Sequence, residues 1–65
     1  MYPSINNKTE YNDKLFQAEY AYSHGDYATA SMYFLACLNY AQENNMPTEY
    51  LEMKIQDSKR NGCTD

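Results

Sequence analysis

Few side chains in this sequence could do chemistry, and they are poorly grouped. The one histidine, His24, lies between Ser23 and Gly25. Catalysis by a histidine needs a nucleophile or an acid held beside it, and residues adjacent in the chain rarely form such a pair. His24, Cys37 and Cys63 lack the spacing of a metal site, and two glycines do not make a phosphate-binding loop. We therefore predict that the protein is not an enzyme and has no cofactor or metal.

Aromatic side chains are the stronger signal. The chain has eight tyrosines and two phenylalanines among 65 residues, and no tryptophan. Tyrosine buries a large area at a small cost in conformational entropy, and it is enriched at the hot spots of binding interfaces. This composition favours a protein that works by contact with another protein.

The helix that must position many of these rings lies in the middle of the chain. Residues 27–42 contain no charged side chain, and Asp26 and Glu43 flank them. A helix that is apolar on nearly every side must be covered all round. A chain of this length buries only about 60% of its unfolded surface and has little else to cover it with. We therefore expect the protein to associate, as a homodimer or with a partner.

The net charge, the N-terminal residues and the uncharged stretch limit the expected partners and location. The net charge is −4, and the five basic residues are scattered except for Lys59 and Arg60. Affinity for nucleic acid comes from clustered positive charge, so we expect no direct nucleic-acid binding. The first ten residues do not resemble a signal peptide, and the uncharged stretch is too short to span a membrane. The expected location is the cytoplasm, without membrane association and with both cysteines reduced.

Helical periodicity and turn residues predict an all-α fold without strands. A first helix begins near Thr9 or Asn12 and ends at the break of residues 23–26, where Gly25 can adopt a left-handed conformation and Asp26 can cap the next helix. A second helix runs from Tyr27 to residue 43 or 44. The short connection predicts a two-helix antiparallel hairpin.

A shorter third helix is expected to complete the domain. It begins at Pro47, which suits a first helical turn, and runs to about Lys59, with Gly62 able to stop it. The predicted organisation is a disordered segment over residues 1–8, one helical domain over 9–60 and a flexible tail over 61–65.

The apolar residues divide into a core and an interface. Helical spacing assigns one set to the core: Tyr11, Leu15, Ala18, Tyr22, Tyr27, Ala30, Phe34, Cys37, Ala41, Leu51 and Ile55. The remaining large residues cannot all share that core, and we assign them to the partner or the dimer: Phe16, Tyr20, Met32, Tyr33, Leu35 and Tyr40.

Two resemblances follow from the hairpin. The run from Gly25 through Tyr27 and Ala30 to Phe34 is similar to the turn and second helix of a tetratricopeptide repeat. A pattern of small and aromatic residues over about residues 11–60 resembles the AraC negative regulator family of bacteria. It comprises Ala18, Gly25, Tyr27, Ala30, Phe34, Ala36, Ala41, Asn45 and Tyr50.

The second resemblance implies a function. Members of that family bind AraC/XylS-type transcription activators directly, block their dimerisation or DNA binding, and lower the transcription of virulence genes. Some also contact the histone-like nucleoid-structuring protein. The alternative is a small helical adaptor, or a protein like a secretion chaperone, that binds a helical peptide.

Overall fold

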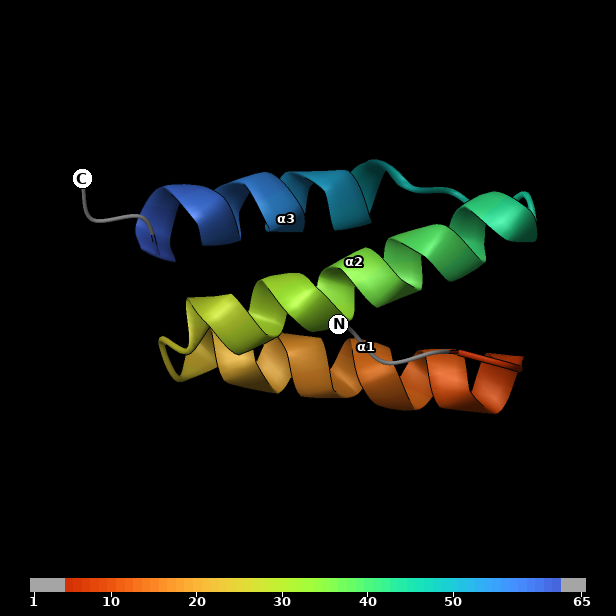
Figure 1. Ribbon diagram of the computed structural model, residues 1–65, viewed down its shortest axis with the longest axis horizontal. Helices are drawn as coiled ribbons and strands as arrows, with labels where there is room; N and C mark the ends of the chain where they lie inside the picture. The colour runs from red at the N-terminus through yellow and green to blue at the C-terminus, as the bar shows by residue number, and fades with distance from the viewer. Residues whose placement is uncertain (1–4, 63–65) are drawn as a thin grey trace.

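Three helices make up the fold, and the described part of the chain contains no strand. The computed structural model describes residues 5–62. Helix α1 spans Lys8–Ser23, α2 spans Tyr27–Glu43 and α3 spans Glu49–Gly62 (Figure 1). The all-helical class is therefore confirmed. The expectations for Cys63 and for residues 1–4 and 63–65 lie outside the described residues.

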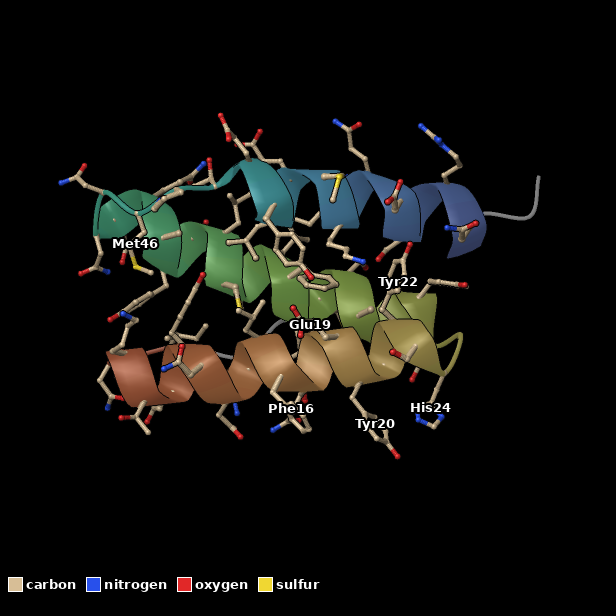
Figure 2. All side chains as sticks on the ribbon, turned by 180° about the vertical axis from the view of Figure 1, so that it is seen from behind. Phe16, Glu19, Tyr20, Tyr22, His24 and Met46 are labelled. Carbon is tan, nitrogen blue, oxygen red and sulfur yellow. The ribbon has the colours of Figure 1, made fainter. Side chains whose placement is uncertain are left out.

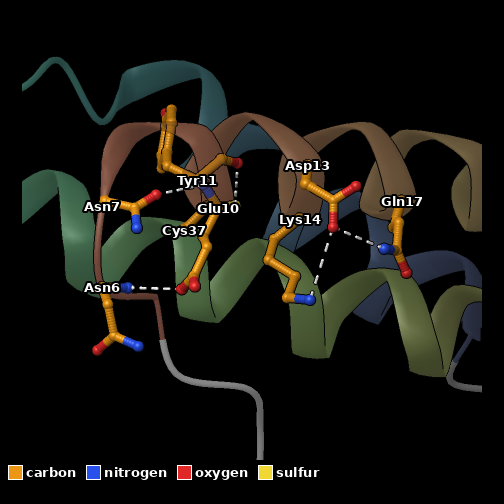
Figure 3. A network of polar contacts seen from close by, with 8 residues as sticks. All are labelled: Asn6, Asn7, Glu10, Tyr11, Asp13, Lys14, Gln17 and Cys37. Carbon is orange, nitrogen blue, oxygen red and sulfur yellow. Dashed lines mark hydrogen bonds and ion pairs between the residues drawn. The ribbon is translucent and has the colours of Figure 1, made fainter.

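Helix α1 begins at Lys8, slightly before either predicted start. The Asn7 side chain caps it by accepting a hydrogen bond from the Glu10 backbone N–H at 2.9 Å. The Glu10 carboxylate in turn accepts from the backbone N–H of Asn6 at 3.0 Å (Figure 3). The first bond satisfies one of the N–H groups that the helix leaves free, and the second holds the residue before the cap, so the helix starts directly after Asn7.

The connection between α1 and α2 has the predicted chemistry. Gly25 has a φ of 81°, in the left-handed region that costs glycine little. Asp26 caps α2 by accepting from the Thr29 backbone N–H at 3.3 Å. The chain reverses here and again between α2 and α3, so α2 lies between the other two helices (Figure 1).

The predicted start of the third helix at Pro47 is wrong. Helix α3 begins at Glu49, because Thr48 supplies the start: its carbonyl accepts from the Glu52 N–H and its hydroxyl donates to the Glu52 carboxylate, both at 2.9 Å. The helix also runs past Lys59. Gly62 is its last residue, and a Cβ there would lie 3.0 Å from Cβ of Tyr27. A glycine thus lets the end of α3 approach the start of α2.

Small residues and one large ring form the core. Ala18 of α1 and Ala30, Cys37 and Ala41 of α2 are fully buried, and so is Phe34. Small side chains allow close approach of helix backbones, and Phe34 fills the remaining space. From α3, Leu51 and Ile55 complete the cluster. Tyr11 is also buried, whereas Leu15, Tyr22 and Tyr27 are half-buried.

Helix α2 is better covered than its sequence suggests. It packs against α1 on one side and α3 on the other (Figure 1). Ala36 is buried, and Met32 is the single large apolar residue of α2 that is exposed. Helix α3 covers the side of α2 that α1 leaves open. None of the helices in the described region is long and apolar enough to cross a membrane.

Candidate functional site

The residues assigned to an interface fall into two groups in the structure. Phe16, Tyr20 and Met32 are exposed, with 66%, 58% and 41% of their surface open to solvent. Tyr33, Leu35 and Tyr40 are half-buried and pack against the core cluster. The Tyr40 ring stacks on that of Tyr11, with centroids 5.2 Å apart. Phe16 and Tyr20 expose most of their surface to a partner, and Met32 exposes somewhat less than half.

A row of rings runs along the outer face of α1. Phe16, Tyr20 and His24 are spaced four residues apart, so they lie one above the next on the helix. The Tyr20 and His24 rings stack with centroids 4.2 Å apart, and those of Phe16 and Tyr20 are 6.5 Å apart. Figure 2 shows all three side chains on the side of α1 that faces away from α3. We call these three residues the aromatic row.

A groove of about 430 Å³ lies beside the aromatic row. Both α1 and the first turns of α2 contribute to it. Its lining residues are Phe16, Gln17, Tyr20, Ala21, His24, Asp26, Thr29 and Tyr33. Its volume is in the range of ligand-binding clefts, and Asp26 is its one formally charged residue. This groove unites the exposed residues Phe16 and Tyr20 with the half-buried Tyr33, three of the six predicted interface residues.

A second aromatic cluster lies on another side of α1, and side chains of this same chain supply both its cation and its carboxylate. The Tyr50 hydroxyl of α3 donates a hydrogen bond of 2.7 Å to the Glu19 carboxylate of α1. Lys54 Nζ lies 4.1 Å from the Tyr22 ring centroid and 5.7 Å from that of Tyr50. Burial, reinforced by the bond to Glu19, raises the pKa of Tyr50 to about 12. The cluster therefore joins α3 to α1. Its cation, Lys54, contacts rings of the same chain.

Cys37 has the surroundings of a structural thiol. It is fully buried, and its Sγ lies 3.9 Å from the Tyr11 carbonyl oxygen. Burial and the nearby Glu19 charge raise the pKa of the Cys37 thiol to about 11. Burial also raises the pKa of Tyr11, with a smaller contribution from Cys37. A high thiol pKa leaves little reactive thiolate at neutral pH, so Cys37 acts as a packing residue.

The remaining polar groups do not assemble a reactive centre. No group of three potential metal ligands occurs within residues 5–62. Asp13 contacts Lys14 and Gln17 on the surface of α1 (Figure 3). A second hollow of about 400 Å³ lies between the start of α2 and the end of α3, lined by Tyr27, Ala28, Ser31, Ser58, Lys59 and Gly62.

Comparisons with models of protein families, with curated proteins and with solved structures found no match for this chain. The assignment of function therefore depends on the geometry above and on the sequence pattern.

Three contributors to these sites, His24, Tyr50 and Lys54, were not predicted from the sequence. His24 lies exposed in the turn after α1, and its spacing of four residues from Tyr20 was a visible sign that the two rings stack. Tyr50 and Lys54 also share a helical face, but their contacts with Glu19 and Tyr22 depend on how α3 packs on α1. No local pattern in the sequence carries that information.

Proposed function

We propose that this protein is a negative regulator of transcription that binds an AraC/XylS-type activator directly and blocks its dimerisation or its binding to DNA. The observation that carries the proposal is the aromatic row beside its groove: Phe16 and Tyr20 expose large apolar rings that the fold does not use. Exposed rings of this kind, next to a cleft, are typical of interaction sites. The choice of an activator as partner, and of virulence genes as the target, depends on the resemblance described above.

The mode of binding that we propose is contact between helices. The groove runs between α1 and the first turns of α2, and a helix laid along it would present residues to Phe16, Tyr20 and Tyr33 in turn. An activator held in this way would have part of its own dimerisation or DNA-binding surface covered. In this proposal the same surface also serves to bind a histone-like nucleoid-structuring protein.

We also propose that the protein forms a homodimer. In this proposal α3, which packs on the antiparallel hairpin of α1 and α2, makes the dimer contact. Tyr50 and Met53 of α3 expose 45% and 52% of their surface and lie three residues apart on the helix. Such a pair suits a small self-association contact. In this proposal the dimer contact and the activator contact lie on different helices.

An affinity capture with identification of the bound protein tests the proposed function. The immobilised protein is exposed to native cell lysate beside a double variant, Phe16→Ser with Tyr20→Ser, and a control variant, Met53→Ser. Capture of an AraC-type activator by the parent and by Met53→Ser, but not by the double variant, supports the proposal. Adding the protein should then release the purified activator from its promoter DNA.

Other outcomes decide against it. Capture of a secreted effector or a filament subunit in place of an activator favours the adaptor or chaperone alternative. Capture of an activator that the double variant retains in full shows that the aromatic row is not the binding surface.

A further inference from the structure

We propose that the groove receives an arginine side chain of the partner, with its guanidinium over the aromatic rings and next to the Asp26 carboxylate. The inference rests on the proposed function in taking this groove as a partner-binding surface. It adds the chemistry by which a partner is recognised there.

The internal cluster on another side of α1 provides the comparison. There, Lys54 lies over Tyr22 and Tyr50, and the Glu19 carboxylate is bonded to Tyr50. Rings, a carboxylate and a cation are thus brought together within the molecule. A cation over an aromatic face is attracted by the ring quadrupole, and a nearby carboxylate adds to that attraction.

The groove also brings aromatic rings and a carboxylate together, and no lysine or arginine is among its lining residues. Phe16, Tyr20 and Tyr33 supply the rings, and Asp26 supplies the carboxylate. The His24 ring also lines the groove and stacks on one face of Tyr20. Within residues 5–62, no lysine or arginine lies over these rings, and Asp26 forms no ion pair. One Asp26 oxygen, Oδ1, accepts from the Thr29 N–H, and the other accepts no hydrogen bond from the part of the chain that the structure describes. A cation from outside would complete the set.

Charge and shape favour arginine as the occupant. The chain carries a net charge of −4, which attracts a basic partner to this groove. The guanidinium group is planar, is weakly hydrated and stacks on aromatic faces while it donates to a carboxylate. A lysine ammonium is a compact, strongly hydrated charge and fits this combination less well.

A titration with a single amino-acid derivative tests the site. N-acetyl-arginine amide is added to the protein while side-chain NMR signals are followed, and N-acetyl-citrulline amide serves as the uncharged control of nearly the same shape. We expect saturable shifts of the Phe16, Tyr20 and Tyr33 ring signals with the arginine derivative and much weaker shifts with citrulline. The lysine derivative should bind more weakly than the arginine derivative.

Two variants separate charge from folding. Asp26→Asn removes the charge but keeps a side chain that caps α2 well, and it should weaken binding roughly fivefold. Tyr20→Leu keeps an apolar side chain but removes the aromatic face, and it should also weaken binding. Met53→Ser is the control variant and should bind like the parent.

Equal binding of the arginine and citrulline derivatives overturns the proposal, as does the absence of ring shifts at tens of millimolar. Undiminished binding by Asp26→Asn overturns it too. The probe contains no part of an activator, so these results are independent of the capture experiment. The protein could bind an activator without binding the arginine derivative in the groove, or bind the derivative without binding an activator.

Discussion

At the scale of single residues, the environment of each titratable group sets how stability depends on pH. Cys37 and Tyr50 have pKa values of about 11 and about 12 in the fold, against ordinary values of 9.0 and 10.0. In both cases the folded state favours the protonated form. The unfolded chain loses these protons first as the pH rises, so the stabilisation is complete below pH 9 and is lost between pH 9 and 12.

We predict a decline of the free energy of unfolding from pH 9 upward. Cys37→Ala should make the decline in the free energy of unfolding less steep between pH 9 and 11. Tyr50→Phe should make it less steep above pH 10. Tyr50 is 45% exposed, so solvent screening keeps its share to about 1 kcal/mol or less. Urea titrations from pH 8 to 11 on the parent and both variants measure this. Identical pH slopes for all three would contradict the assignment.

Ser58 is a second residue whose surroundings predict an effect. It is 2% exposed, and its hydroxyl oxygen has no hydrogen-bond partner within the described residues. A buried polar group without a partner costs free energy, and alanine is the better helix former. Ser58→Ala should therefore stabilise the protein by about 1 kcal/mol. Urea unfolding compares it with Ser31→Ala, whose hydroxyl has a backbone acceptor, the Ala28 carbonyl, at 3.1 Å.

A loss of stability in Ser58→Ala would show that the hydroxyl is bonded in solution. A gain equal to that of Ser31→Ala would assign the effect to helix propensity alone.

At the scale of the elements, the two glycines act by different means. Gly25 has a φ of 81°, and a Cβ there would meet nothing within 4 Å. Gly25→Ala should thus cost about 1–2 kcal/mol through backbone strain only. Gly62 lies where a Cβ would press on Tyr27, at the last residue of α3, so Gly62→Ala should instead shift or shorten the end of that helix.

Thermal unfolding followed by circular dichroism, together with amide exchange at the end of α3, distinguishes the two effects. Gly25→Asn is the matched control, because asparagine tolerates the left-handed region better than alanine does. It should recover part of the lost stability. If Gly25→Asn is no more stable than Gly25→Ala, backbone strain is not the cause.

The elements also show what could be read from the sequence. The break at Gly25 and Asp26 and the helical spacing around Phe34 are local signals, so the extent of α2 was predicted correctly. The start of α3 was not, because Pro47 and Thr48 offer competing starts and Thr48 also bonds to Glu52. Local pattern does not rank two adjacent starts of this kind.

The candidate site was predictable only in part. The large residues beyond one helical stripe could be identified, but not which of them the third helix covers. Leu35 packs against the core, and Phe16 does not. An acidic substitution at Leu35 would therefore test folding, whereas one at Phe16 tests binding. This difference depends on tertiary packing and not on residue type.

At the scale of the whole molecule, surface area limits how many partners the protein can hold. A specific interface of standard size covers about 800 Å² on each partner. The accessible surface of the chain is 4434 Å², so one such interface would cover roughly a fifth of it. A dimer and an activator can be bound together only if their contacts lie apart. The aromatic row of α1 and the exposed Tyr50 and Met53 of α3 offer that separation.

Opposite effects of two substitutions should therefore follow. Met53→Glu places a charge in the proposed dimer contact and should give a monomer that still captures its partner. The double variant of Phe16 and Tyr20 to serine should stay dimeric and lose the partner. Light scattering across a range of concentrations gives the mass, and capture gives the binding. If both sets of substitutions abolish both properties without loss of helicity, a single surface serves dimer and partner, and the two compete.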